Sequence, residues 1–263
     1  MADFSVADDL ALALAIAGEA DLIALERYRA QDLDVQLKPD HTQVTDGDRR
    51  VEQLVRSRIE AARPHDAVHG EEFGMTGSGT RVWIVDPIDG TSNFVRGVPN
   101  WGLLLALVVD GVPAVGVASA PALGRRWWAA TGHGAWGQEA GASIRRLAVS
   151  GVTDLAEASL SYNSLKGWDE AGRLDELIAL SRAVARTRAY GDVWSYMLAA
   201  EGAVDVVAEF DLKPWDMAAI IPIVREAGGL ATTADGDDSL DAGSLLVSNG
   251  SLHAAVLEII SAR

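Results

Sequence analysis

The sequence predicts a layered α+β fold, because antiparallel hairpins lie between helical segments near the two ends of the chain. Two apolar runs, residues 103–109 and 112–118, are joined by Asp110-Gly111, a dipeptide typical of tight hairpin turns. From about residue 171 onward helical and strand patterns alternate. Hairpins and helices mixed in this way favour a layered α+β or mixed fold over a plain doubly wound one.

The N-terminal apolar run, residues 10–17, predicts a buried helix. Asp8 and Asp9 precede it, where an export signal would carry basic residues, and the run is too short to span a bilayer. We therefore expect a cytoplasmic location and no membrane partner. A second amphipathic helix is expected behind Thr45-Asp46, because apolar residues recur at helical spacing over residues 51–59.

Later elements follow from the same signals. The expected order is strand 126–130, helix 174–184, helix 194–200, strand 204–208, a helix from Trp215 to Ala227, strand 245–248 and helix 252–260. Pro214 and Gly228 bracket the Trp215 helix as start and stop signals.

Composition limits the classes of partner and the number of domains. A chain of 263 residues, 49% hydrophobic, can bury one core, and we expect a single domain over residues 1–263 with closely packed halves of about 1–150 and 151–263. The net charge of −16 argues against binding to nucleic acid or to an anionic membrane. The absence of cysteine excludes disulfides and thiolate metal sites, and fits a reducing compartment.

The segment from Trp83 to Thr91 is the most informative motif, because it sets two carboxylates, Asp86 and Asp89, on a turn after an apolar strand. Pro87 has no N–H, so we expect the strand to end at Asp86. A helix is expected to begin near Thr91. Carboxylates bind Mg²⁺ and a helix N-terminus binds phosphate; the alternative is a capped turn with two solvated aspartates.

Two further acidic positions are candidates for the same site. Glu71 and Glu72 lie on a predicted turn after residues 67–69, and Asp216 lies in the first turn of the helix that Pro214 begins. Taken singly, each is more typical of surface charge.

Together, the three segments resemble the inositol monophosphatase family of Mg²⁺-dependent, lithium-sensitive phosphatases. The resemblance covers essentially the whole chain and rests on residues 70–72, 83–94, Trp215-Asp216 and 226–229. It implies a five-layer αβαβα sandwich, a homodimer and a small phosphorylated metabolite as substrate. Finer features are similar to the histidinol-phosphatases of high-GC bacteria, and lie at residues 96–99, 125–130 and 188–192.

The resemblance also implies a metal site with two to three Mg²⁺ ions. Glu71, Asp86 and the backbone carbonyl of Ile88 would hold the first ion. Asp86, Asp89 and Asp216 would hold the second. Two such ions can lower the pKa of an attacking water and clamp the attacking and leaving oxygens.

Other roles are implied for residues around these ligands. Thr91 with Glu71 would orient and deprotonate the water, and Asp46 would help to bind a third, looser ion. The N–H groups of Gly90 and Thr91 would hold the phosphate.

Substrate binding would also involve Asp89, Asp216, Glu209, Gly191 and Asp192. An aspartate at position 192 favours a cationic leaving group such as histidinol, which carries an ammonium; alternatively it caps the following helix. Arg188 is expected to be either a substrate ligand or an interface residue.

Three functions stay open on the sequence: a histidinol-phosphate phosphatase, an inositol-1-monophosphatase or other small sugar or nucleotide phosphatase, and a regulatory or binding protein with incidental phosphatase activity. Loss of a metal ligand would favour the last, and every expected ligand is present.

Overall fold

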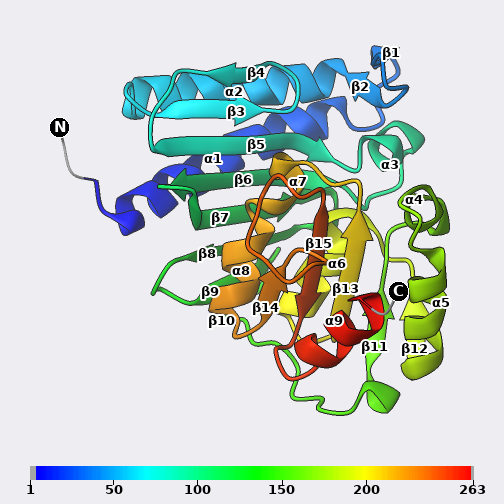
Figure 1. The fold of residues 1–263 in the computed structure, drawn as a ribbon. Coiled ribbons are helices and arrows are strands. Elements are labelled where there is room, and N and C mark those ends of the chain that lie inside the picture. Colours follow the sequence, from blue (N-terminus) through cyan, green and yellow to red (C-terminus); the bar gives the residue numbers. More distant parts are fainter. Residues whose placement is uncertain (1–3, 262–263) are drawn as a thin grey trace.

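The computed structural model describes residues 4–261, which form two main sheets with helices between and outside them (Figure 1). The helices are α1 (Val6–Arg27), α2 (Asp46–Ala62), α3 (Thr91–Arg96), α4 (Leu165–Glu170), α5 (Leu174–Ala183), α6 (Asp192–Ala200), α7 (Pro214–Met217), α8 (Ile220–Glu226) and α9 (His253–Ser261), with short 3-10 turns η1 (Pro121–Leu123) and η2 (Leu155–Glu157). The strands are β1 (Val35–Leu37), β2 (Gln43–Thr45), β3 (Ala67–Gly70), β4 (Gly74–Thr76), β5 (Arg81–Asp89), β6 (Gly102–Val109), β7 (Val112–Ala120), β8 (Arg125–Ala130), β9 (Ala135–Glu139), β10 (Arg145–Arg146), β11 (Ser159–Ser161), β12 (Arg186–Arg188), β13 (Val206–Phe210), β14 (Leu230–Thr232) and β15 (Ser244–Ser248).

The strands of the two main sheets come from different halves of the chain. The larger sheet has the order β10-β9-β8-β7-β6-β5-β3-β4 and is antiparallel except for the parallel pair β3 and β5. The smaller sheet has the order β12-β11-β13-β15-β14, with β11 parallel to both of its neighbours. A separate hairpin joins β1 to β2. The boundary predicted near residue 150 lies between β10 and η2.

Helices and sheets alternate in five layers, which confirms the predicted αβαβα sandwich. Helices α1 and α2 cover one face of the larger sheet, while α6 and α8 fill the space between the two sheets. Helices α4, α5 and α9 pack on the outer face of the smaller sheet. Side chains from both halves of the chain share the central apolar cluster.

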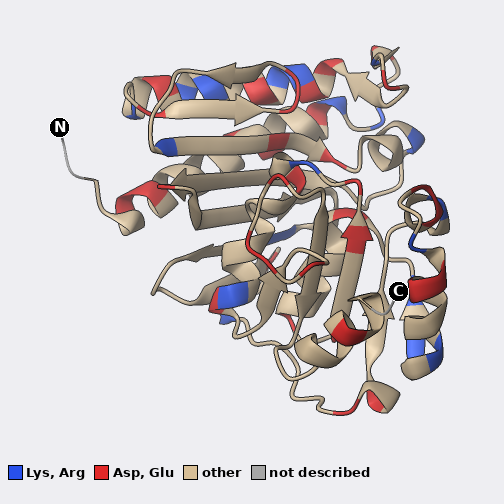
Figure 2. Cartoon of the chain, in the orientation of Figure 1, with Lys and Arg blue, Asp and Glu red and all other residues tan. Residues whose placement is uncertain are grey.

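Both faces of β6 are buried, and this explains its uninterrupted apolar sequence. Leu103, Leu105 and Leu107 face α1 and α2, while the alternate residues face α6 and α8. Across the sheet, Gly116 of β7 lets α8 approach closely, because a Cβ there would lie 2.2 Å from the Ala219 carbonyl oxygen. Figure 2 shows that charged residues lie on helices such as α2 and α5, whereas β6 and β7 carry none.

Most predicted elements are confirmed within two residues. Asp110 and Gly111 form the β6–β7 turn with φ of 50° and 82°, as the hairpin dipeptide predicts. Thr45 caps α2, and the N-terminal apolar run lies within α1. Within residues 4–261, no helix is long and apolar enough to cross a membrane.

Two predicted boundaries are wrong, and proline accounts for both. The strand expected to end at Asp86 continues to Asp89, because a register shift between Asp86 and Asp89 accommodates Pro87, which has no N–H to donate. The single helix expected over residues 215–227 is divided into α7 and α8. Pro222 cannot donate to the Ala218 carbonyl, which weakens the helix where the two pieces meet.

Candidate active site

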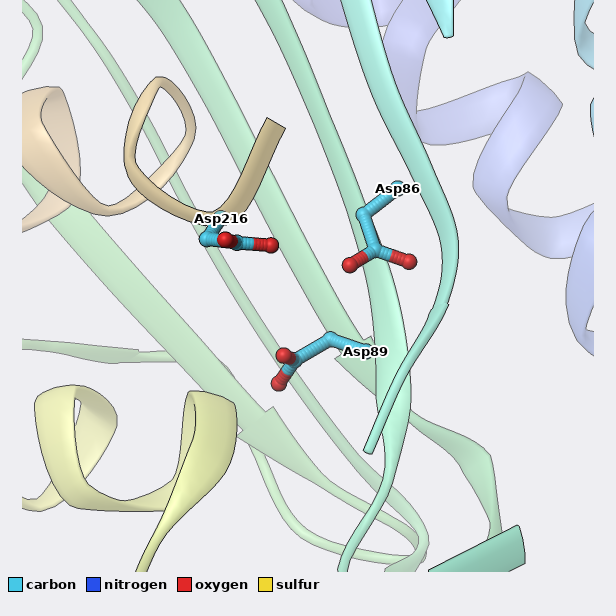
Figure 3. A group of neighbouring side chains, drawn as sticks. All are labelled: Asp86, Asp89 and Asp216. Atoms are coloured by element: carbon cyan, nitrogen blue, oxygen red, sulfur yellow. The ribbon is translucent and has the colours of Figure 1, made fainter. Parts of the chain in front are cut away.

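Three carboxylates from distant parts of the sequence meet at one point between the sheets. Asp86 and Asp89 come from the end of β5, and Asp216 comes from α7 (Figure 3). One carboxylate oxygen from each of the three aspartates can be chosen so that all three oxygens lie within 4.8 Å of one another. This spacing suits three groups that bind a common cation.

Local backbone structure brings these side chains together. In a regular strand, residues three apart point to opposite faces, so Asp86 and Asp89 would diverge. The extra residue accommodated at Pro87 shifts this alternation and lets both carboxylates reach the same site. Asp216 is held at the start of α7, where its Oδ2 accepts a hydrogen bond of 2.7 Å from the Lys213 N–H.

The electrostatics of the group favour a bound cation. Burial, followed by repulsion from neighbouring carboxylates, raises the pKa of Asp86 and of Asp89 well above the ordinary value. Burial also raises the pKa of Asp216 to about 7. A divalent cation would offset this repulsion, and a set of oxygen donors fits Mg²⁺, a hard ion that prefers carboxylates.

A buried glutamate positions the turn that carries Glu71. The carboxylate of Glu52, which is fully buried, accepts hydrogen bonds of 2.8 Å from the Glu72 N–H and 3.2 Å from the Phe73 N–H. Gly70 makes room for it, because a Cβ there would lie 2.0 Å from Glu52 Oε1. Glu71 then lies beside Asp86, Asp89 and Asp216 along one cavity.

A lysine from the β1–β2 hairpin contacts this turn. Lys38 Nζ lies 2.6 Å from Oε1 of Glu71 and 2.6 Å from Oε1 of Glu72. Burial raises the pKa of Glu72 to about 7, although the lysine acts in the opposite direction. Lys38 therefore neutralises part of the negative charge at this edge of the site.

Thr91 is oriented by two acceptors. Its hydroxyl lies 3.0 Å from the Ile88 carbonyl oxygen and 3.2 Å from Asp48 Oδ1. The Ile88 side chain is fully buried in the core, so only its backbone faces the site. Asp48 is itself buried, and burial raises its pKa to about 6.

The structure does not bring Asp46 to this site, which corrects the expectation for that residue. Its carboxylate pairs with Arg27 at 2.8 Å and accepts from the Asp34 N–H. Asp48, two residues later, occupies the position beside Thr91. A sequence signal for Asp48 exists, because Thr45 and Asp48 form a capping box at the start of α2.

On the other side of the acidic group, Asp192 is held by a side chain from α3. Asn93 Nδ2 donates to Asp192 Oδ2 at 2.7 Å. Asp192 has φ of 48° and is the first residue of α6, whose N-cap is Gly191, so the alternative in which Asp192 caps this helix is wrong. Asp89 stabilises the start of α6 instead, because its Oδ2 accepts a hydrogen bond of 2.5 Å from the Val193 N–H in the first turn.

Two cavities open on either side of these carboxylates. One, of about 530 Å³, is lined by Glu71, Ile88, Gly90 and Thr91; the other, of about 290 Å³, is lined by Glu209 and by residues of α4 and α6. Asp89, Asp192 and Asp216 line both cavities.

Two remaining candidates from the sequence differ in position. Gly191, with φ of 75°, begins α6 next to the shared carboxylates. Arg188 lies exposed at the end of β12, and among the described residues it is not one of those that line either cavity. Asn93 and Glu52 were not predicted as site residues, since their partners lie far from them in sequence.

Comparison with known proteins agrees with this geometry. The model of the inositol monophosphatase family matches residues 6–263. The chain is 51% identical to a histidinol-phosphatase of Streptomyces coelicolor over 97% of this chain and 98% of that protein. It is 54% identical to a histidinol-phosphatase of Mycobacterium tuberculosis, with the same coverage. The crystal structure of the extragenic suppressor protein suhB from Bartonella henselae superposes with a TM-score of 0.87 at 27% identity, over 97% of this chain and 99% of that one. The protein belongs to the inositol monophosphatase family.

Proposed function

We propose that the protein is a Mg²⁺-dependent phosphomonoesterase that hydrolyses L-histidinol phosphate to L-histidinol and phosphate. The main observation behind this proposal is that the Asp192 carboxylate lines both cavities. A negative charge at this position favours a cationic leaving group. The relatives called histidinol-phosphatase support the same substrate. We also propose a cytoplasmic homodimer.

The acidic group supplies the metal site of this proposal. Glu71, Asp86 and the Ile88 carbonyl would hold one Mg²⁺, and Asp86, Asp89 and Asp216 would hold a second. When bound, the ions would lower the pKa of a water and neutralise charge on the phosphate oxygens. The Gly90 and Thr91 N–H groups, at the start of α3, would bind the phosphate.

Thr91 and Asp48 would move the proton of the attacking water, in place of the pair Thr91 and Glu71 that the resemblance implied, because the Thr91 hydroxyl contacts Asp48. The Thr91 hydroxyl can donate to only one of its two acceptors at a time, so its oxygen keeps lone pairs free for a water. As the water attacks phosphorus, its proton would pass to Thr91 Oγ1, while the Thr91 proton passes to Asp48 Oδ1. A carboxyl with a pKa of about 6 is suited to accept a proton near neutral pH.

A substrate panel tests this function. Phosphate release from L-histidinol phosphate, inositol 1-phosphate and fructose 1,6-bisphosphate would be measured with Mg²⁺ and again with excess chelator. We expect L-histidinol phosphate to have the highest kcat/KM and chelator to abolish turnover. A preference for inositol 1-phosphate would refute the substrate, and no turnover of any compound would favour a regulatory or binding protein.

A further inference from the structure

The smaller cavity is lined in part by aromatic side chains that the proposed reaction leaves unexplained. Trp168 of α4 packs edge to face against Phe210 of β13, with ring centroids 4.7 Å apart. Tyr196 of α6 and Glu209 of β13 line the same cavity. We call these four residues, Trp168, Tyr196, Glu209 and Phe210, the ring pocket.

Three atoms of the ring pocket, Trp168 Nε1, the Tyr196 hydroxyl and Glu209 Oε1, are buried polar groups without a hydrogen bond of ordinary geometry to any described residue. The Tyr196 hydroxyl and the Glu209 carboxyl lie next to each other, whereas the indole N–H has no such neighbour. The three residues are 1%, 2% and 3% exposed, so bulk water does not satisfy them. Because buried polar atoms are almost always paired in folded proteins, three such atoms around one cavity indicate a ligand with complementary groups.

The chemistry of these atoms restricts that ligand. Burial, followed by the influence of the neighbouring Glu209 carboxyl, raises the pKa of the Tyr196 hydroxyl, so Tyr196 keeps its proton and can donate toward Glu209. The indole N–H of Trp168 then remains as a free donor, and Glu209 keeps capacity to accept. A ligand must therefore offer one donor and one acceptor beside a flat surface.

We infer that the ring pocket binds the imidazole ring of the leaving group, with the ring N–H donating to Glu209 and the other ring nitrogen accepting from Trp168 Nε1. A neutral imidazole carries one donor and one acceptor nitrogen in a planar ring. The inference rests on the proposed function and extends it, because it gives the ring a position separate from Asp192 and the ammonium. A cyclitol, which has no flat face, would leave the aromatic walls poorly matched.

The variant Trp168→Phe tests the inference, because it removes the N–H and keeps an aromatic ring. Trp194→Phe is the matched control, since Trp194 packs on Trp127 and does not line the cavity. The substrates are L-histidinol phosphate and L-alaninol phosphate, which has the same amino alcohol with a methyl group in place of the imidazolylmethyl group. Binding of L-histidinol in the presence of Mg²⁺ and inorganic phosphate, measured by calorimetry, gives a readout apart from turnover.

We expect Trp168→Phe to lower kcat/KM for L-histidinol phosphate by about 2–13-fold, the range for one neutral hydrogen bond. L-Histidinol binding should weaken by a similar factor. Hydrolysis of L-alaninol phosphate should change less than about twofold, since this substrate never reaches the indole. Trp194→Phe should leave all three measurements unchanged.

Equal losses on both substrates, or equal behaviour of Trp168→Phe and Trp194→Phe, would overturn the inference. If Trp168→Phe fails to fold, the inference can still be tested by ligand binding to the unaltered protein. L-Histidinol methylated on either ring nitrogen has no ring N–H to donate and should bind at least about fivefold more weakly; equal binding would show that the ring pocket holds only water. Failure of the unaltered protein to hydrolyse L-histidinol phosphate would instead refute the proposed function.

Discussion

Replacing Asp192 by asparagine separates the charge of this residue from its shape. Asparagine has nearly the same volume, and its side-chain oxygen can still accept from Asn93 Nδ2, which lies 2.7 Å from the native Asp192 Oδ2. It also tolerates the left-handed backbone at this position, where φ is 48°. The substitution should therefore keep the backbone and the hydrogen bond and remove only the negative charge.

The expected effect on activity depends on the substrate. If the carboxylate pairs with the ammonium of L-histidinol phosphate, Asp192→Asn should cost about 1.5–3 kcal/mol, the range for a hydrogen bond to a charged group. This corresponds to roughly 10–150-fold in kcat/KM. Inositol 1-phosphate has no cation, so its hydrolysis should fall by less than about threefold.

The same substitution should lower kcat/KM for L-histidinol phosphate but raise the free energy of unfolding. Burial raises the pKa of Asp192 from 3.8 to about 6. The folded state therefore binds this proton more tightly than the unfolded chain does, and the ionised carboxylate destabilises the fold progressively between these two pH values and fully above the second. At 1.36 kcal/mol per unit, removing the charge should raise the free energy of unfolding of the metal-free protein at pH 8 by at most about 3 kcal/mol. This gain should shrink toward pH 4.

Steady-state kinetics on both substrates and urea unfolding at several pH values would measure these effects. Asp110→Asn is the matched control, because Asp110 has φ of 50° but lies exposed in the β6–β7 turn. Asp110→Asn should change neither kcat/KM nor the free energy of unfolding appreciably. Equal losses on both substrates, together with a lowered free energy of unfolding, would show that Asp192 is structural and refute the reasoning.

Four further predictions follow from the site and the core. Asp89→Asn should abolish Mg²⁺-dependent hydrolysis while far-UV circular dichroism stays native, since one ligand charge is lost; turnover in excess chelator would contradict this. Li⁺ should inhibit at low Mg²⁺ and matched ionic strength, because an ion of half the charge stabilises the leaving oxygen less; full activity would count against the assignment. Ile88→Val should cost about 0.5–1.5 kcal/mol in urea unfolding yet keep kcat, because only the backbone of this buried residue faces the site. Burial lowers the pKa of His253, so the free energy of unfolding should fall as pH drops below about 6.5, and His253→Gln should flatten that part of the profile.

Short-range patterns in the sequence were enough to predict most elements of the fold. The Asp110-Gly111 turn and the Thr45 cap each depend on residues within a few positions, because turns and caps are satisfied locally. The apolar run of β6 predicts a buried strand by composition alone, although the helices that bury it come from distant parts of the chain. The effect of proline was harder to predict. Because Pro87 has no N–H, we expected the strand to end at Asp86. In the structure, a register shift in the pairing with β6 accommodates Pro87, and β5 continues to Asp89.

The sequence by itself determined the fold class and indicated the acidic segments around Asp86, Asp89 and Asp216, since residue type and spacing carry that information. Only the tertiary structure decided which neighbours complete the site. It pairs Asp46 with Arg27 and leaves Asp48 beside Thr91. It joins Asn93 to Asp192 across 99 residues and Asp89 to the Val193 N–H across 104. The physical reason is that the chain conformation near each residue follows from adjacent side chains, whereas the partner of a buried carboxylate depends on which distant elements pack around it.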